Sequence, residues 1–345
     1  MDSWSHLSIY ESTDLVRRVF KARHNRELNA QKSKEIVSVI AQGREYFSAA
    51  SESGPLVRPL LQYYGVLSLS RGLILLLSPN LRETSLPQAH GLSSSGWNNL
   101  LATEIINPTE LKVKIINGTF LSLLKETQNS QTSVLFQAPY PNKLILTRYG
   151  QLTGIEDATV SFQQVLSRIP ELRQTYEKSF GAPSNTYRAF AFNLSLVTQT
   201  DIDLFGGAHG LPSEQEIRSS LNLAANSELH LTDHHNFFPP EPHYHIRIHH
   251  PQGTDYYQLL PCLDNENEGV TSVIVPFPSG YSISILGRFF LLSYYLGTLA
   301  RYHPTAWLSM MQGQQKGDYL LPLIRESMSV IQVRFPSLVI QQLEL

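Results

Sequence analysis

Two apolar segments with helical spacing stand far apart in the sequence, and they constrain the fold more than any other feature of this chain. The first runs from Pro59 to Ser78 and the second from Ser284 to Arg301. Each segment contains a Tyr-Tyr pair and an interior arginine. Because a helix that is apolar on all sides is buried in a core or in a membrane, we expect both segments to form a common core. The two ends of the chain would then pack together.

Polar residues within these segments favour a protein core over a membrane. A membrane-spanning helix needs about 20 mostly apolar residues with few or no charges, whereas the two segments contain Arg71 and Arg288. An arginine near the centre of a span costs at least about 2.5 kcal/mol on insertion scales. The N-terminal residues have no basic start followed by an apolar stretch, so they do not indicate a signal peptide. The sequence therefore predicts a cytoplasmic protein with no membrane partner.

The composition sets further limits. With 345 residues, 42% of them hydrophobic, the chain can bury a large core and is expected to form two closely joined domains. The net charge of −2 excludes a global basic field for holding nucleic acid. Charged residues make up 16% of the chain, against about 25% in typical proteins, which favours a polar uncharged surface or large contacts with a partner. The single cysteine, Cys262, excludes an internal disulfide framework.

The spacing of apolar residues predicts an α+β fold in three parts. Residues 1–103 have helical periodicity, and residues 282–345 return to it. Residues 104–281 alternate as strands do, apart from a short helical region near 161–181. We therefore expect a mainly α-helical scaffold, formed by both chain ends, with a β-rich insert in the middle.

The sequence predicts a β-hairpin near the start of the insert. Asn117-Gly118 is a strong signal for a two-residue hairpin turn. The alternating residues 111–116 precede it and the apolar residues 120–124 follow it. We therefore expect two strands joined by this turn.

The interior arginines and a histidine are the first candidates for a functional site. A buried charge needs a partner, because desolvation without one costs several kcal/mol. Arg71 and Arg288 therefore either pair with carboxylates for stability or point toward a cleft and hold a phosphate or carboxylate. His90 follows the first segment in a Ser-, Gly- and Asn-rich loop. It is either a general base or phosphate contact, or a loop histidine bonded to backbone, with Gly91 supplying a positive φ.

The second apolar segment leads into Arg301-Tyr302-His303-Pro304. Proline suits the first turn of the next helix, and an arginine near a helix end can bond to the last carbonyls, so one interpretation is a capping role. The alternative is that Arg301 and Tyr302 line a pocket with the His90 loop. Because both sequences follow core segments that we expect to be neighbours, we predict that His90 and Arg301 lie near one cleft.

A row of histidines marks one strand of the insert. His243, His245, Arg247 and His249 fall on one strand face at a period of two. Three histidines on one face resemble a zinc site, but the fixed charge of Arg247 repels a divalent ion. We therefore predict no metal here, and we expect the row to face solvent or an acidic partner.

Several of these stretches resemble the YaaC-like proteins of bacteria. Pro59-LLQYYGVLSLSRGLILL followed by His90-Gly91-Leu92 resembles their N-terminal motif, and Ser167-RIPEL172 resembles their central helix. Leu296-GTLARYHPTAW307 followed by Phe335-Pro336 resembles their C-terminal motif. The resemblance spans the whole chain and implies a cytoplasmic bacterial protein without an established reaction. The residues that match the motifs, and that we take as candidate binding residues, are Tyr63, Tyr64, Arg71, His90, Gly91, Arg301, Tyr302, Pro304 and Trp307.

The Tyr-Tyr helix and the His-Gly loop are also similar to HEPN-like helical domains. Such domains often pair as dimers and often accompany effectors in conflict and defence systems. Four to six residues separate their catalytic arginine from a histidine, and here six and five residues separate Arg17 and Arg18 from His24. About two such spacings arise by chance in a chain with this many arginines and histidines, so the spacing adds little to the resemblance.

Two functional hypotheses follow. The first is an interaction or regulatory subunit, an accessory component of a bacterial defence system, which binds a protein partner or another copy of itself. The alternative is a HEPN-related enzyme that acts on RNA or a nucleotide, with His90 as base and Arg71 and Arg301 as phosphate contacts. The sequence indicates no cofactor under either hypothesis.

Overall fold

The structure of the protein is a computed structural model. Only the backbone is described for 131–135, 143–148, 191–193, 263–265 and 271. The described residues are 3–102, 107, 109–135, 143–149, 152, 154–193, 198–207, 209–234, 240–254, 263–265, 271–314 and 318–344.

These residues form an α+β fold, as the sequence predicts, and the chain divides into two compact units. Unit 1 consists of Met1–Asn129, Leu152–Val165 and Ser284–Leu345, so it unites both ends of the chain. Unit 2 consists of Ser130–Gln151 and Leu166–Ile283.

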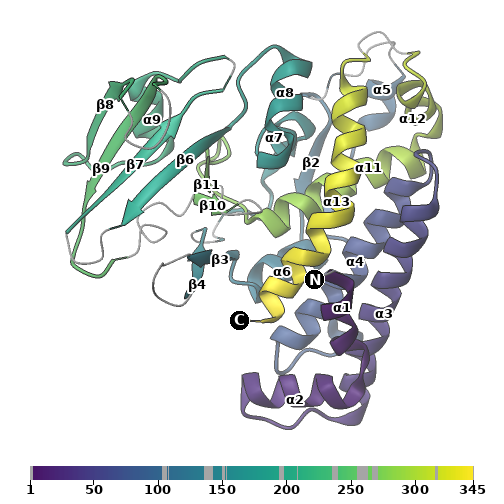
Figure 1. Cartoon of the computed structure of the whole chain (residues 1–345). Coiled ribbons are helices and arrows are strands. Elements are labelled where there is room, and N and C mark those ends of the chain that lie inside the picture. Colours follow the sequence, from purple (N-terminus) through teal and green to yellow (C-terminus); the bar gives the residue numbers. More distant parts are fainter. Residues whose placement is uncertain are drawn as a thin grey trace. The chain divides into compact units, whose positions relative to one another are not determined.

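Unit 1 is mainly helical (Figure 1). It includes residues 109–129 and 154–165, which the sequence analysis assigns to the insert, and these add a helix and two strands to it. Its small sheet is antiparallel, in the order β1-β2-β5. The elements are α1 (Ser3–Leu7), η1 (Ser8–Glu11), α2 (Thr13–His24), α3 (Ala30–Glu52), α4 (Arg58–Leu77), η2 (Glu83–Ser85), β1 (Leu92–Ser93), α5 (Trp97–Leu101), β2 (Lys112–Ile115), α6 (Thr119–Glu126), β5 (Thr159–Ser161), α11 (Ile285–Tyr302), α12 (Pro304–Met311) and α13 (Leu320–Leu343), while α7 (Phe162–Leu166) crosses the boundary between the units.

The two apolar segments become α4 and α11, which pack directly on each other in unit 1. They come close at Gly297, where an added Cβ would lie 2.7 Å from the Cβ of Tyr63. α4 approaches α3 in the same way, because a Cβ on Gly65 would lie 2.6 Å from a ring carbon of Phe47. α6 and α13 also pack on α4. The absence of side chains at these points lets the helix backbones come close, which makes α4 the centre of unit 1.

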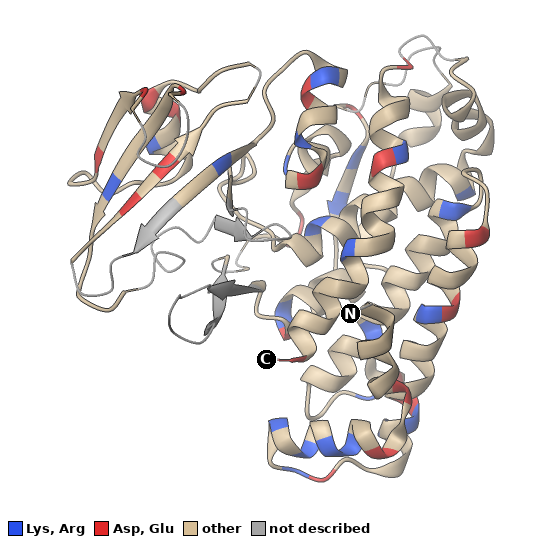
Figure 2. Cartoon of the chain, in the orientation of Figure 1, with Lys and Arg blue, Asp and Glu red and all other residues tan. Residues whose placement is uncertain are grey.

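α4 is also the helix that most resembles a membrane span. Among the described residues it alone is long and apolar enough to cross a membrane, and 67% of its most apolar window is buried inside the protein. Such burial fits the core helix of a soluble protein. Charged residues lie instead on helices such as α2, which carries several Lys and Arg positions (Figure 2).

The hairpin predicted at Asn117-Gly118 is wrong. α6 begins directly after Gly118, and β2 pairs with β1 and β5 instead of with a strand formed by residues 120–124. Phe120, Leu123 and Leu124 are fully buried, and their spacing of three and four residues is that of a helix. Gly118 serves a close approach, since a Cβ there would lie 2.2 Å from the amide nitrogen of Gly91. Tertiary packing has thus overridden the local turn signal.

Unit 2 is built on a six-stranded antiparallel sheet in the order β10-β11-β6-β7-β9-β8. The sheet shares an apolar core with α9, in which Ile217 of the helix and Leu221 just after it cluster with Ile202 and Ile246 of the strands. β3 and β4 pair separately. The elements are β3 (Ser130–Leu135), β4 (Lys143–Arg148), η3 (Pro170–Leu172), α8 (Arg173–Phe180), β6 (Thr186–Asn193), β7 (Gln199–Phe205), α9 (Glu214–Ser220), β8 (Glu228–Thr232), β9 (His243–His249), β10 (Leu263–Asn265) and β11 (Thr271–Ile274).

Replacing Gly297 with alanine should destabilise the protein by about 1–3 kcal/mol, the usual cost of overpacking a core. The added methyl group overlaps Tyr63, and this outweighs a gain in helix propensity of at most about 1 kcal/mol. Chemical denaturation followed by circular dichroism measures the change. Gly54→Ala is the matched control, because a Cβ there meets no atom within 4 Å. A Gly297→Ala protein as stable as the wild type would contradict the described packing.

Candidate functional site

Backbone hydrogen bonds fix the loop that carries His90. The amide of Thr119 donates to the carbonyl of Ala89, and the amide of Phe120 donates to the carbonyl of His90, both at 3.0 Å. Gly91 has a φ of +88°, a left-handed conformation that glycine adopts without steric cost. The loop is therefore held against the start of α6, and the side chain of His90 is half-buried.

Two tyrosines from the two core helices pack around the imidazole of His90. The ring of Tyr63, from α4, lies 5.5 Å from it between centroids, and the ring of Tyr294, from α11, lies 6.4 Å away. The tyrosine rings pack edge to face at 5.6 Å. The hydroxyl of Tyr294 donates to the carbonyl of Leu92 at 3.2 Å. His90 is thus placed by α4, by α11 and by the start of β1.

Arg301 extends the site toward the surface. Its Nη1 donates to the hydroxyl oxygen of Tyr64 at 2.5 Å. Its guanidinium lies 5.7 Å from the ring centroid of Tyr64 and 4.9 Å from that of Tyr302, and such cation–π contacts are attractive. Tyr302 is 61% exposed. Arg301 therefore binds a side chain of α4 and does not use a helix carbonyl as a cap.

Several polar groups of this site lack partners. Arg71 lies two helical turns after Tyr64, on the same face of α4. Within the described part of the chain, Arg71 has no ion pair or hydrogen bond, and Arg301 has no carboxylate partner. Within the same described residues, the Nδ1 of His90 and the hydroxyl of Tyr63 are buried without a hydrogen bond. Each such group lowers the stability of the fold by about 1–3 kcal/mol. We name this set the His90 cluster, consisting of Tyr63, Tyr64, Arg71, His90, Tyr294 and Arg301.

The electrostatics of the His90 cluster favour an anion. Burial lowers the pKa of His90, and the positive charges of Arg301 and Arg71 lower it further, so the imidazole is neutral at pH 7. Burial raises the pKa of Tyr63, so its phenol keeps its proton and can donate a hydrogen bond. Arginines bind phosphate and carboxylate groups through paired N–H donors. The two arginines, which lie beside a neutral imidazole and a protonated phenol, can therefore attract an anionic group.

The remaining residues from the sequence analysis lie apart from this centre or have other roles. Pro304 is the first residue of α12. Trp307 is buried, and its Nε1 donates to the carbonyl of Pro55 at 3.2 Å, which joins α12 to the chain before α4. Arg288 is fully buried inside α11. Tyr294 is not among the candidates predicted from the sequence, although its position two helical turns before Arg301 places both on one face of α11.

The histidine row of β9 needs a correction. His243 is only 1% exposed, so the row does not face solvent along its length. Carboxylates of the neighbouring strand β7 meet it instead. His245 Nδ1 donates to Asp203 Oδ1 at 2.6 Å, and Arg247 Nε donates to Asp201 Oδ1 at 2.8 Å. The antiparallel register places these pairs opposite each other. Among the described residues, no group of three or more His, Cys, Asp and Glu side chains is placed to hold a metal ion.

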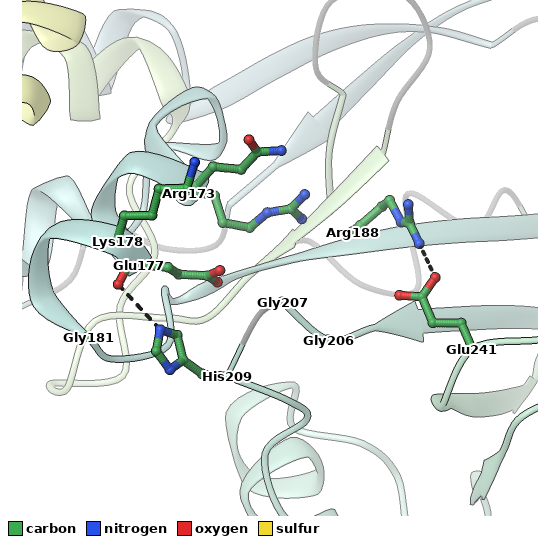
Figure 3. Close-up of a pocket in the computed structure, with 10 residues that line it drawn as sticks. Arg173, Glu177, Lys178, Gly181, Arg188, Gly206, Gly207, His209 and Glu241 are labelled. Atoms are coloured by element: carbon green, nitrogen blue, oxygen red, sulfur yellow. Dashed lines mark hydrogen bonds and ion pairs between the residues drawn. The ribbon is translucent and has the colours of Figure 1, made fainter.

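Unit 2 also contains a pocket of about 590 Å³ that the sequence analysis misses. The only sequence signal for it is a local excess of glycine around position 207. Its lining residues are Arg173, Gln174, Glu177, Lys178, Gly181, Arg188, Gly206, Gly207, His209 and Glu241 (Figure 3).

Comparison with known proteins gives one match. The family model described as YaaC-like Protein matches residues 8–343. No curated protein and no solved structure matches the chain. The family match covers both core helices and the His90 cluster, but it names no reaction or ligand.

Replacing Arg301 with glutamine should raise the pKa of His90 toward its ordinary value. The pKa should stay below about 6.5, the value of a free histidine, because burial and Arg71 still act on it. An NMR titration of the imidazole protons measures both proteins. Arg18→Gln is the control, since Arg18 is an exposed arginine of α2 outside the His90 cluster. An identical titration midpoint for His90 in the wild type and Arg301→Gln would refute this electrostatic coupling.

The pair of His245 and Asp203 should make stability depend on pH. The hydrogen bond that the carboxylate of Asp203 accepts from His245 raises the pKa of His245. The stabilisation is therefore complete below about pH 6.5, the unfolded-state pKa, and is lost as pH rises through the folded-state pKa. Near pH 5.5, His245→Gln should lower the free energy of unfolding by about 1.5 kcal/mol, as for a hydrogen bond to a charged group.

Chemical denaturation of the wild type and His245→Gln between pH 5.5 and about pH 8.5 measures this difference. The difference should shrink toward alkaline pH. Asp203→Asn should remove the same pH-dependent part, because it takes away the carboxylate that holds the proton. A loss of stability in His245→Gln that stays constant over this range would argue against the ion pair.

Proposed function

The chain belongs to the YaaC-like protein family, whose model matches residues 8–343, and we propose that it acts as an interaction or regulatory subunit that binds an anionic group of its partner through the His90 cluster. One observation carries this proposal. Arg71 and Arg301 both lower the pKa of His90, and neither has a carboxylate partner within the described part of the chain. Two positive charges are therefore left for a ligand to neutralise.

The surface beside the His90 cluster supports binding to a protein. Tyr302 is exposed and stacks on Arg301, and tyrosine and arginine are enriched among residues that dominate interface energies. Leu308 is 39% exposed and Val57 is 50% exposed. The hydrogen bond of Trp307 to the carbonyl of Pro55 holds the segments of these two residues together. A partner with a carboxylate or phosphate beside an apolar side chain would fit both features.

Further parts of the proposal rest on resemblance alone. We place the protein in the bacterial cytoplasm, as the family resemblance implies, and the buried state of α4 agrees with a soluble protein. The likeness of the Tyr-Tyr helix and His-Gly loop to HEPN-like domains motivates a role in defence and a homo-oligomeric state. Infection assays on a deletion strain and light scattering of the purified protein test these two points.

A second candidate function is an enzyme related to HEPN proteins that acts on RNA or a nucleotide. The observation that favours it is the lowered pKa of His90, because a neutral imidazole can accept a proton at pH 7. Arg71 and Arg301 would then hold the phosphate. Binding without turnover separates the regulatory protein from this enzyme.

The test measures binding and turnover on the same protein. Fluorescence anisotropy follows the purified chain with a labelled hexaglutamate peptide and a labelled short RNA, and chromatography follows cleavage of RNA and ATP. We expect binding of an anionic probe without turnover. Arg301→Ala should weaken binding about tenfold, the loss of roughly 1.4 kcal/mol, while Arg18→Ala should leave it unchanged.

Two results would count against the proposal. RNA or ATP turnover that disappears in a folded His90→Ala protein would replace the regulatory function with the enzymatic one. Failure of the wild type to bind any anionic probe, or equal binding by Arg301→Ala and Arg18→Ala, would remove the His90 cluster as the binding site.

A further inference from the structure

The pocket of unit 2 is formed by elements that approach from different parts of the sequence (Figure 3). α8 supplies Arg173, Glu177 and Lys178, and the segment after β7 supplies Gly206 and Gly207. Its volume of about 590 Å³ is within the range of small-molecule sites, about 300–1,000 Å³. The pocket lies entirely within unit 2 and shares no residue with the His90 cluster.

The two glycines give this pocket a wall of bare backbone. A Cβ on Gly207 would lie 2.3 Å from a carboxylate oxygen of Glu177, and a Cβ on Gly206 would lie 2.7 Å from the carbonyl oxygen of Gly210. A side chain at Gly206 would overlap the backbone of Gly210, and one at Gly207 would displace the carboxylate of Glu177. In Figure 3 the carboxylate of Glu177 points toward Gly207. The backbone can therefore approach both Glu177 and a ligand closely.

Part of the polar lining is already paired. Arg188 Nη2 donates to Glu241 Oε2 at 2.8 Å, and its guanidinium lies 4.6 Å from the ring centroid of Phe205. His209 Nε2 lies 3.3 Å from the carbonyl oxygen of Glu177. These contacts hold the side chains of Arg188 and His209 in place. Arg188 and His209 are therefore fixed parts of the pocket wall.

Two cations of α8 are not paired. Arg173 is half-buried and Lys178 is exposed, and within the described part of the chain neither has a hydrogen bond or an ion pair. In Figure 3 the side chain of Arg173 points across the pocket toward Arg188. The three cations Arg173, Lys178 and Arg188 outnumber the carboxylates Glu177 and Glu241 in the lining. The pocket thus has an excess of positive charge. The two cations without partners in the described part of the chain, Arg173 and Lys178, both belong to α8.

We propose that this pocket binds a small phosphate-bearing molecule, with Arg173 as the main contact of the phosphate and Lys178 as a second one. The guanidinium group matches a phosphate with two parallel N–H donors. The glycine backbone leaves room for the rest of the molecule, and the carboxylate of Glu177 suits donor groups such as hydroxyls or amines. A nucleotide has this combination of groups and fits the volume.

The experiment uses the full chain with Arg71→Ala and Arg301→Ala, so that the His90 cluster no longer contributes to anion binding. Isothermal titration calorimetry with pyrophosphate and AMP measures phosphate binding, and citrate is the carboxylate probe. We expect AMP or pyrophosphate to bind more tightly than citrate. Adding Arg173→Ala should weaken binding at least about tenfold. Arg173→Lys should have an intermediate effect, because it keeps the charge and loses the paired donors.

Arg218→Ala is the matched control. Arg218 is also a partly buried arginine of unit 2, but it pairs with Glu214 at 2.9 Å and does not line the pocket. Its removal changes the net charge equally and should leave the affinity unchanged. If circular dichroism finds Arg173→Ala unfolded, the comparison of Arg173→Lys with Arg218→Ala decides the question.

Three outcomes would overturn the proposal. The first is no binding of pyrophosphate or AMP at millimolar concentration. The second is equal affinity in the folded Arg173 and Arg218 variants. The third is tighter binding of citrate than of either phosphate compound, which would assign the pocket to carboxylates. None of these results depends on the His90 cluster, because its two arginines are already removed.

Discussion

The close packing of α4 on α11 is the contact on which unit 1 and its candidate site depend. A hydrogen atom in place of a side chain at Gly297 lets the backbone of α11 approach Tyr63. Glycine within a helix costs about 1 kcal/mol relative to alanine, so this close approach is maintained against local propensity. The same interface brings Tyr63 and Tyr294 into edge-to-face contact at 5.6 Å. The geometry around His90 is therefore set by helix packing more than by the loop alone.

The sequence predicts the helical core well because its signal is strong and local. The segments 59–78 and 284–301 are too apolar for any place other than an interior, and both become core helices of unit 1. Prediction fails at Asn117-Gly118, where a turn preference competes with packing. The amide of Phe120 donates to the carbonyl of His90, a partner far upstream that no local pattern reveals. Phe120, Leu123 and Leu124 are buried at helical spacing. The chain therefore forms a helix where the turn signal alone favours a strand.

Residues of the candidate sites can be predicted from the sequence only where they stand out within their own segment. Arg71 and Arg301 attract attention in the sequence because each adjoins or interrupts an apolar run. Asp203 and His245 are 42 residues apart, and only the register of β7 and β9 makes them partners. The pocket of unit 2 likewise depends on the approach of α8 to a segment beyond β7. Arg173 is not unusual in its own stretch of sequence, and the glycines around position 207 do not by themselves indicate a pocket.

The His90 cluster takes its residues from both ends of the fold, and this has a consequence for synthesis. Tyr63 and Arg71 leave the ribosome early, whereas Tyr294 and Arg301 leave after the whole of unit 2. Domains that form during translation fold as their residues emerge. Until α11 arrives, the apolar side of α4 that it covers has no partner, so a chaperone has time to bind there. A chain that stops before α11 cannot assemble the cluster, so the site exists only in molecules that are translated through α11.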